Sequence, residues 1–280
     1  WGQFDSLNHK WAGGRGDTNG SLAEIDLSNY PLGRGSIALR IEDQDRKFNL
    51  NLADGEILRG ALTLVGLEPA LVASVSDSIL DWIDKNDDPL LAGTESDYYQ
   101  TLDLPYVAKN GPLDDLSELL MVRGVTPAMY WGSSGGGSRT VVFNRPASRS
   151  RFEEPIYAVG LSDLFSVLSG RQVNINTASA AVLQVLPGVD EQLAGAIIAG
   201  RSGMDNLPGT DDDGYRSVAE LMRVPGMTPP ALQVFQRYFT VRSTVFEVHV
   251  TARLDGAQRE FVGLLRRAGR DIQAVGFHWK

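Results

Sequence analysis

The sequence predicts an α+β fold, in which an antiparallel β-sheet carries a large inserted all-α domain. Two observations lead to this prediction. Alternating apolar residues mark one strand near the start of the chain and three near its end, while the long stretch between them follows helical periodicity. Strands separated in this way most simply share one sheet. The expected strands are Ser36 to Asp45, Phe239 to Leu254, Arg259 to Arg267 and Ile272 to Trp279.

This order predicts three consecutive parts. We expect residues 1–49 to form the first part of the sheet domain, residues 50–238 the inserted helical domain, and residues 239–280 the completion of the sheet. Residues 1–31 are rich in Gly, Asn and Asp, so we expect mostly loop with a short initial helix. Leu254 to Ala257 and Gly269 to Asp271 are typical of hairpin turns.

The insert is predicted to consist of short helices. Apolar residues recur at helical spacing between turn residues, and two polar or glycine-rich stretches, Ser133 to Ser138 and Asp205 to Gly214, interrupt the pattern. Besides a pair described next, the expected helices are 55–65, 68–85, 115–122, 127–131, 162–168, 217–223 and 229–237.

The most informative stretch is Val173 to Arg201, VNINTASAAVLQVLPGVDEQLAGAIIAGR. Asn176 or Thr177 can cap a first helix that stops at Pro187-Gly188. A second helix follows, capped by Asp190 and ending near Gly200. Two short helices around a Leu-Pro-Gly-Val turn resemble a helix-hairpin-helix, a SAM-like motif.

The same turn recurs elsewhere in the insert. Around Gly124 and Gly226 the chain repeats the order apolar pair, Gly, apolar residue, Thr or Asp, and then a helix former. A weaker fourth copy surrounds Gly66. Because the spacing of these glycines is uneven, we expect one compact domain built from hairpins rather than a solenoid of fixed period.

Composition restricts the classes of partner and site. The chain is 42% hydrophobic and 22% charged, which is ordinary for a globular protein, and its net charge of -9 with a pI of about 4.9 disfavours a phosphate backbone as ligand. The absence of cysteine excludes disulfides and thiolate sites. No apolar run approaches the roughly 20 residues of a membrane span. Trp1 as first residue indicates a processed or trimmed chain.

An acidic run after the helical stretch Ser76 to Ile83 predicts a calcium site. Asp84, Asn86 and Asp88 alternate, and Glu95 follows at the distance that closes an EF-hand loop. Pro89 stands where an EF-hand has Gly, so the site would share the donors of an EF-hand and not its backbone path. Asp97 completes the predicted ligand set, with Asp87 and Tyr98 as supporting or substitute ligands.

Two alternatives to metal binding stay open for the acidic segments. The run from Asp84 can be a solvated helix C-terminus, although acids suit the negative end of a helix dipole poorly. A second cluster, Asp211 to Asp213, is as readily a plain polar loop as a metal site.

No catalytic constellation is present in the sequence. The three histidines, His9, His249 and His278, show no ligand-like spacing. The serines lie in no nucleophile elbow, and no phosphate-binding loop or zinc-binding helix motif occurs. We therefore expect a non-enzymatic protein, with a hydrolase of unrecognised site as a distant alternative.

Several long motifs occur in the same order as in a known family. They are RIEDQDRKFNLN from Arg40, SILDWIDKNDDP from Ser78, the pair Tyr98-Tyr99, LSELLMVRGVTP from Leu116 and VNINTASAAVLQVLPG from Val173. In these motifs the chain resembles the type II secretion system minor pseudopilin K family over residues 36 to 280.

The resemblance implies a pilin-like sheet with an inserted α-domain. It also implies an N-terminal helix, absent from this sequence, that anchors the protein in the bacterial inner membrane, with the rest in the periplasm. The implied function is to cap the tip of the pseudopilus with the minor pseudopilins I and J and help initiate its assembly, for export of folded proteins across the outer membrane.

A DNA-binding or DNA-uptake protein of the cell envelope is the alternative, because helix-hairpin-helix turns commonly hold a phosphate. Asp190-Glu191 at the start of the second helix would repel phosphate, and we interpret Arg201, Arg216, Arg223 and Arg237 as solvated helix ends. A basic collar around Gly188 and Gly226 would favour DNA, and an acidic or apolar one the assembly function.

Overall fold

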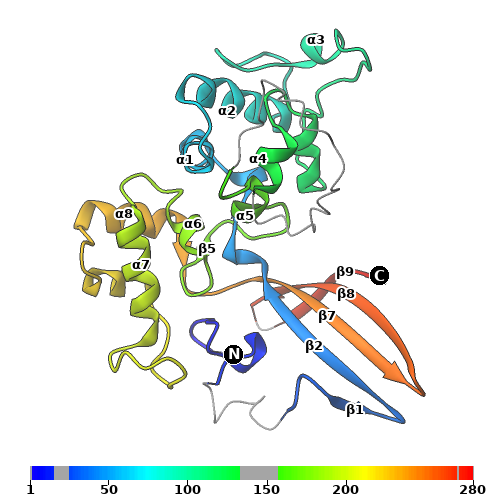
Figure 1. The fold of residues 1–280 in the computed structure, drawn as a ribbon, viewed down its shortest axis with the longest axis vertical. Coiled ribbons are helices and arrows are strands. Elements are labelled where there is room, and N and C mark those ends of the chain that lie inside the picture. Colours follow the sequence, from blue (N-terminus) through cyan, green and yellow to red (C-terminus); the bar gives the residue numbers. More distant parts are fainter. Residues whose placement is uncertain (1, 16–24, 133–156, 270, 280) are drawn as a thin grey trace, which may run out of the picture. The chain divides into compact units, whose positions relative to one another are not determined.

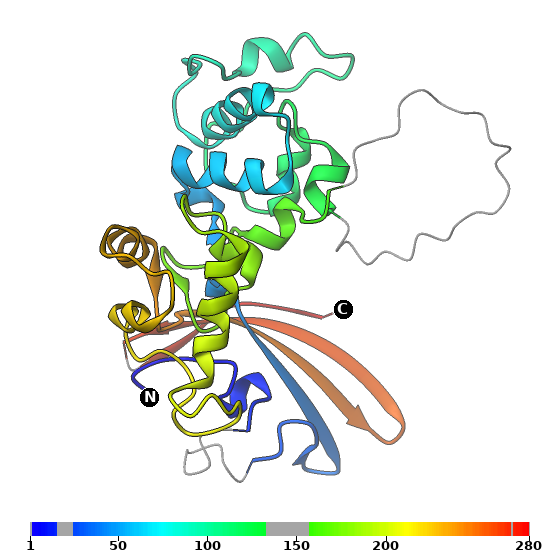
Figure 2. The same cartoon turned by 60° about the vertical axis from the view of Figure 1, so that its left-hand side comes forward.

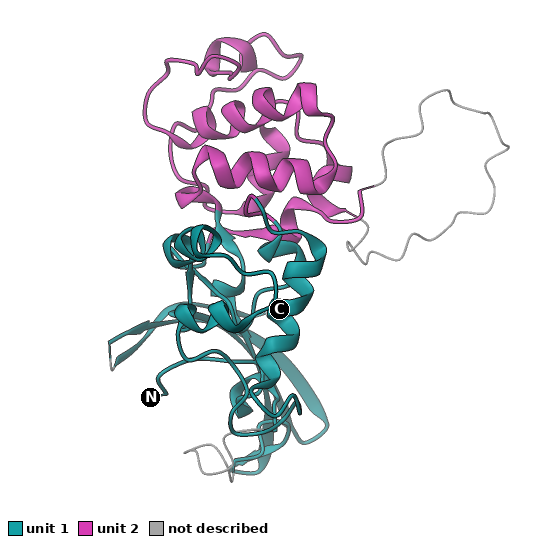
Figure 3. Ribbon diagram, turned by 90° about the vertical axis from the view of Figure 1, so that its left-hand side faces the viewer, with its two compact units in different colours: residues 1–49, 168–184, 188–280 teal, residues 50–167, 185–187 magenta. Residues whose placement is uncertain are grey.

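The computed structural model describes residues 2–15, 25–132, 157–269 and 271–279. The chain divides into two compact units, which Figure 3 shows in different colours. Unit 1 comprises residues 1–49, 168–184 and 188–280, and unit 2 comprises residues 50–167 and 185–187. The expected loop Ser133 to Ser138 lies outside the described residues. Among the described helices, none has the length and apolar character needed to cross a membrane.

Unit 1 contains a five-stranded antiparallel sheet in the order β1-β2-β7-β8-β9, whose long strands twist together in Figures 1 and 2. Strand β2 pairs with β7 from Ser36 opposite Arg253 to Asp43 opposite Phe246, so the start and the end of the chain share one sheet, as predicted. The strands are β1 (Tyr30–Leu32), β2 (Gly35–Asp43), β7 (Val245–Leu254), β8 (Ala257–Ala268) and β9 (Asp271–Trp279).

Two details of the sheet bear on the predictions. The turn between β7 and β8 has positive φ at Asp255 (49°) and Gly256 (83°), which fits the predicted hairpin. Strand β1 was expected to be loop. It holds an edge position, where Pro31 removes no necessary hydrogen-bond donor.

The predicted strand from Phe239 to Leu254 is wrong as one element, because it is interrupted at residues 241–244. The backbone N–H groups of Ser243 and Thr244 donate to the carboxylates of Asp5 (2.9 Å) and Asp45 (2.6 Å) instead of to a neighbouring strand. The first piece, β6 (Phe239–Thr240), pairs in parallel with β5 (Val173–Asn174), apart from the large sheet.

The rest of unit 1 is made of short helices and turns. Apart from β3 (Phe48–Asn49), these elements are α6 (Ala180–Leu183), α7 (Glu191–Ala199), α8 (Pro229–Tyr238) and the 3-10 helices Lys10–Ala12, Gln44–Arg46, Gly200–Ser202 and Val218–Arg223.

Unit 2 is built around two longer helices, α1 (Gly55–Val65) and α2 (Pro69–Ile83), which lie side by side in Figures 1 and 2. The Asp54 carboxylate caps α1 by accepting the N–H groups of Glu56 and Ile57, both at 3.1 Å. The other elements are α3 (Ser96–Tyr99), α4 (Pro127–Trp131), α5 (Leu161–Leu164), β4 (Phe165–Ser166) and the 3-10 helices Leu50–Leu52 and Leu116–Met121.

The two units divide the expected insert of residues 50–238. Unit 2 begins at Leu50, where the insert was expected to begin, but residues 168–184 and 188–238 are grouped with the sheet in unit 1. A single inserted helical domain over residues 50–238 stays a prediction.

Candidate metal centre and hairpin turns

Three carboxylates converge at the end of α2. Asp81 lies in the last turn of this helix, Asp84 is the residue after it, and Glu95 immediately precedes α3. One oxygen atom from each lies within 4.8 Å of the others. Of the five predicted ligands, the structure therefore brings Asp84 and Glu95 together, and it adds Asp81.

Glu95 is the member of this group that most needs a charged partner. Its side chain is only 5% exposed, and within the described part of the chain neither carboxylate oxygen accepts a hydrogen bond. Burial, together with the negative charges of Asp81 and Asp84, raises its pKa to about 7. A buried carboxylate without donors requires either a proton or a cation.

Asp81 organises the loop that follows α2. Its fully buried carboxylate accepts the backbone N–H groups of Leu90 (3.1 Å) and Thr94 (2.6 Å), and burial raises its pKa. The loop passes so close that a Cβ atom at Gly93 would collide with this carboxylate. Asp81 thus fixes the chain path that carries Glu95 back to Asp84.

The other predicted ligands lie around this group. Asp84 accepts the N–H of Asn86 (3.0 Å), and Asn86 accepts the N–H of Asp88 (2.9 Å), which together make an exposed turn. Asp97 is exposed on α3. Asp87 accepts a hydrogen bond from Asn110 (3.2 Å), which lowers the pKa of Asp87.

Contacts from the turn at Gly124 hold the acidic loop in place. The Arg123 guanidinium donates to the Thr94 hydroxyl (2.8 Å), and the Arg123 N–H donates to the hydroxyl of the buried Tyr99 (3.3 Å). The Tyr99 ring also packs edge-to-face on Trp82. A rigid set of oxygen donors with an unpaired buried carboxylate fits a hard cation such as calcium.

The second acidic cluster contains Asp205, Asp212 and Asp213, with one oxygen of each within 4.8 Å of the others. These carboxylates have donors in their own loop. Asp213 accepts the N–H of Gly209 (2.7 Å), Asp212 that of Met204 (2.7 Å), and Asp205 that of Leu207 (2.8 Å). This pattern is what the polar-loop alternative requires.

The four hairpin-like turns share a backbone geometry. Gly66, Gly124, Gly188 and Gly226 all have φ between 80° and 96°, a conformation that favours glycine. In the three stronger copies a side chain caps the next helix: Thr126 accepts the N–H of Met129, Asp190 that of Leu193, and Thr228 that of Ala231. Glu68, in the weaker copy, makes no such cap.

The predicted cap of α6 is wrong. Ser179 caps this helix by accepting the N–H of Val182 (3.3 Å). Asn176 instead exchanges two hydrogen bonds with the backbone of Tyr215 (2.8 and 2.9 Å), and the Thr177 hydroxyl donates to Asp43 (2.5 Å). Both side chains join segments of unit 1 that are distant in sequence.

The surface of the hairpin around Gly188 is acidic, because Asp190 and Glu191 are exposed there. Arg201 was expected to be a solvated helix end, and this is wrong. Its guanidinium donates to the carbonyl of Ala178 (2.6 Å), and burial lowers its pKa to about 10. The Arg201 guanidinium is therefore hydrogen-bonded within the fold. Arg223, by contrast, is exposed near Gly226.

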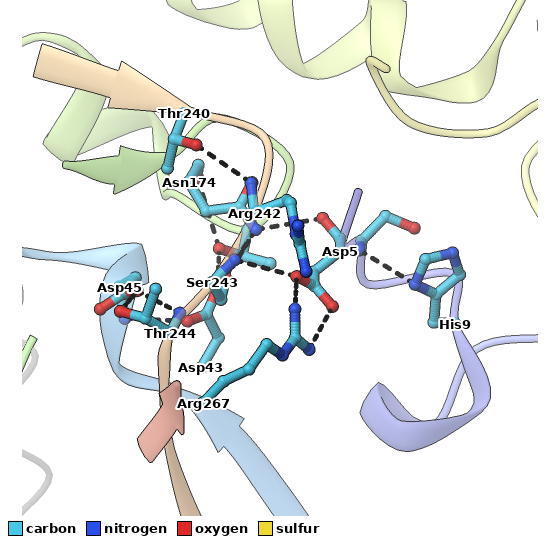
Figure 4. A network of polar contacts seen from close by, with 12 residues as sticks. Asp5, His9, Asp43, Asp45, Asn174, Thr240, Arg242, Ser243, Thr244 and Arg267 are labelled. Carbon is cyan, nitrogen blue, oxygen red and sulfur yellow. Dashed lines mark hydrogen bonds and ion pairs between the residues drawn. The ribbon is translucent and has the colours of Figure 1, made fainter. Parts of the chain in front are cut away.

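Figure 4 shows a polar network that fixes the start of the chain in unit 1. Arg267 on β8 donates two hydrogen bonds to the Asp5 carboxylate (2.7 and 2.9 Å), and the Asn174 amide donates to the Asp5 carbonyl (3.1 Å). The nearby Asp43 accepts from Ser243 (2.6 Å), but burial still raises its pKa to about 6. Here every buried carboxylate has donors.

One face of the sheet is mainly apolar. The register places the following residues on the same side of the pleat: Ile37, Leu39, Ile41, Val248, Val250, Ala252, Phe261, Leu265, Phe277 and Trp279. All of these are half-buried or exposed. Phe277 and Trp279 are 66% and 78% exposed, and Phe277 stacks on Phe261. Arg259, paired with Ala252, also lies on this side. The opposite side carries Arg40, Glu42, Glu247 and His249 together with the apolar Val262 and Leu264.

Comparisons with known proteins match one stretch of the chain to a secretion-system family and another to the helix-hairpin-helix motif. Residues 39–131 match the family model described as type II secretion system (T2SS), protein K, and residues 169–240 match that of the helix-hairpin-helix motif. Type II secretion system protein K of Klebsiella pneumoniae is 24% identical, over 89% of this chain and 73% of its own length. The Pectobacterium carotovorum protein is 23% identical, over 88% and 70%.

A solved structure has the same fold. In the crystal structure of the GspK-GspI-GspJ complex from the enterotoxigenic Escherichia coli type 2 secretion system, one chain aligns with a TM-score of 0.67 and 17% sequence identity. The alignment covers 99% of this chain and 87% of that one.

Proposed function

Because residues 39–131 match the protein K family model and most of the chain is similar to type II secretion system protein K of two bacteria, we propose that it is a minor pseudopilin of this family that caps the tip of the pseudopilus and helps to initiate its assembly. In this function the protein is a non-enzymatic subunit of a machine that exports folded proteins across the outer membrane. Its place would be the periplasm, anchored in the inner membrane by a helix that precedes the residues described above.

The observation that carries this proposal is the apolar face of the five-stranded sheet. Phe277 and Trp279 on β9 continue the row of apolar side chains on β2, β7 and β8 and are more than half exposed. Contiguous exposed apolar surface marks a site of protein association. A sheet with one such face is suited to packing against the helical core of a pilus-like filament.

The partners follow from the solved relative. The Escherichia coli protein of the same fold is in a complex with GspI and GspJ. We infer that this chain assembles with the corresponding minor pseudopilins I and J, and that it does so through the sheet unit.

The additional unit 2 supports a place at the tip. Residues 50–167 are interposed between β3 and the later strands of unit 1, and they add a helical body to a pilin-like sheet. Such bulk would obstruct the addition of a further subunit, so partners are expected on one side only. Cross-links that place pseudopilin subunits on both ends of this chain would refute the tip position.

We further propose that unit 2 binds calcium between Asp81, Asp84 and Glu95, with Asn86, Asp88 and Asp97 available as further oxygen ligands. The unpaired, buried Glu95 carboxylate supports this site. A bound cation would neutralise the three converging charges and would tie the end of α2 to the start of α3.

The assembly proposal is tested by co-purification of the full-length chain with I and J. Phe277→Asp places a charge on the apolar face, and we expect at least about a tenfold loss of complex, as for a central interface residue. His278→Asp is the matched control, because its neighbouring position points to the opposite side of the sheet. Equal recovery of both variants with I and J would contradict the proposal, provided that both chains fold.

The DNA-binding alternative is favoured by one observation, the match of residues 169–240 to the helix-hairpin-helix model. Asp190 and Glu191 at the turn oppose it, as does the net charge of -9. We expect no measurable binding of single- or double-stranded DNA at physiological salt. Micromolar, steeply salt-dependent binding that is lost on changing Gly188 would establish the alternative.

A further inference from the structure

Unit 1 contains a cavity of about 360 Å³ beside the network of Figure 4. Loops that are far apart in sequence form its walls. The lining residues are Asp45, Gly170, Arg171, Gln172, Thr240, Arg242, Ser243, Thr244, Arg267 and Gly269. Most of these residues are polar or charged, although apolar atoms form most of the exposed wall, and neither the candidate metal centre nor the apolar sheet face uses this hollow.

The lining of this cavity is positively charged, whereas the whole chain is negatively charged. Three of the ten lining residues are arginines and one is an acid, although the whole chain has a net charge of -9. The acid, Asp45, is 1% exposed, and its carboxylate already accepts hydrogen bonds from other residues of unit 1. It accepts the N–H groups of Gly170 and Thr244 (both 2.6 Å) and the Thr244 hydroxyl (2.8 Å), so it joins two of the lining loops.

The three arginines differ in how their charges are matched. Arg267 is held by its two hydrogen bonds to Asp5, and its side chain is only 11% exposed. Arg171 and Arg242 are exposed, and among the described residues neither has a carboxylate within ion-pair distance. Two guanidinium groups without a carboxylate partner in the described part of the chain thus line a cavity whose loops are joined by Asp45.

The neighbouring polar groups are arranged to support these arginines. The Gln172 amide donates to the carbonyl groups of Gln236, Arg237 and Phe239 (3.2 to 3.3 Å), which fixes the loop that carries Arg171. The Thr240 hydroxyl accepts the N–H of Arg242 (3.2 Å), so its own hydrogen is left to donate to a ligand.

We propose that this cavity binds an oxyanion, a carboxylate or a phosphate group, through Arg171 and Arg242 with the Thr240 hydroxyl as a further donor. The planar guanidinium fork matches the two oxygens of either group. The oxyanion supplies the negative charge that the two exposed arginines lack among the described residues.

The test is a titration of the isotope-labelled chain with sodium phosphate and, separately, with sodium succinate, followed by NMR of the Gly170, Thr244 and Gly269 amides. Sodium chloride at matched ionic strength controls for screening. We expect a saturable shift with a dissociation constant on the order of 1 mM. The double variant Arg171→Gln, Arg242→Gln should weaken binding about tenfold or more, because charge-assisted hydrogen bonds are lost.

A second double variant, Arg223→Gln with Arg259→Gln, removes the same charge from unit 1 outside the cavity and should bind as the unaltered chain does. A response to phosphate alone identifies a phosphate ligand, one to succinate alone a carboxylate, and one to both the shared oxyanion chemistry. The proposal is overturned if neither anion exceeds chloride, or if both double variants respond equally.

Discussion

Units 1 and 2 both bury carboxylates, and they stabilise them differently. In unit 1, Asp5, Asp43 and Asp45 accept hydrogen bonds from backbone N–H groups, from hydroxyls and from Arg267. In unit 2, neither oxygen of Glu95 has a donor among the described residues, and this side chain faces two further carboxylates. The first group is complete within the described fold, whereas the second requires a proton or a cation from solution.

The comparison predicts its largest effect in unit 1. Arg267→Leu would leave the buried Asp5 carboxylate without its charged partner, which we expect to lower the free energy of unfolding by about 3 kcal/mol. Calcium should not restore this loss. The control is Arg34→Leu, which removes an exposed pair with Asp255 and should cost less than about 1 kcal/mol. Denaturant unfolding with and without calcium measures the loss of stability in both variants. Equal losses would contradict the distinction between the buried and the exposed ion pair.

The next effect belongs to unit 2. Extracytoplasmic calcium sites have dissociation constants of about 0.1 to 1 mM, so about 1 mM calcium should add roughly 0.4 to 1.4 kcal/mol of stability, seen as a rise in melting temperature. Asp84→Ala or Glu95→Gln should abolish the rise. Asp87→Ala should retain most of it, because Asp87 lies outside the converging group. If calorimetry detects no calcium binding at several millimolar, the acidic run is a solvated loop.

The comparison also predicts a dependence on pH. The folded-state pKa of Glu95 is raised from 4.5 to about 7, so the protonated carboxyl stabilises the metal-free fold below pH 4.5, and this contribution is lost as the pH rises through 7. Calcium needs the ionised form, so its effect on melting temperature should grow over the same range.

The variant Glu95→Gln separates this dependence from that of unit 1. Asp43, whose pKa is raised to about 6, should keep a slope of its own in the variant. The difference between the unaltered chain and the variant therefore isolates Glu95. A calcium response that stays constant between pH 5 and pH 8 would show that another group holds the cation.

Local sequence patterns predict much of this fold and fail where distant residues decide. The alternation in residues 36–45 and 259–267 predicts strands because one face of each carries apolar side chains. The break at residues 241–244 could not be predicted this way. It depends on Asp5 and Asp45, about two hundred residues earlier, which capture the N–H groups of Ser243 and Thr244.

The candidate metal centre shows the same limit. Asp84 and Glu95 stand at positions typical of a calcium loop, so their spacing predicts them. Asp81 was missed because it precedes the loop and has the spacing of an ordinary helix residue. It stands three positions before Asp84, so both lie on the same side of the helix end, and this signal could have indicated it.

The attachment of Asp5 has a mechanical consequence. Its backbone N–H donates to the carbonyl of Val241 (2.8 Å), and its carbonyl accepts a hydrogen bond from Asn174. Its carboxylate accepts two hydrogen bonds from Arg267 on β8, and together these contacts form a clamp. A force applied to the chain ahead of Asp5 is therefore borne by β8 and by the segments at Asn174 and Val241 before it reaches β2. Single-molecule pulling from the N-terminus should break this clamp first, and the force needed should fall in Arg267→Leu.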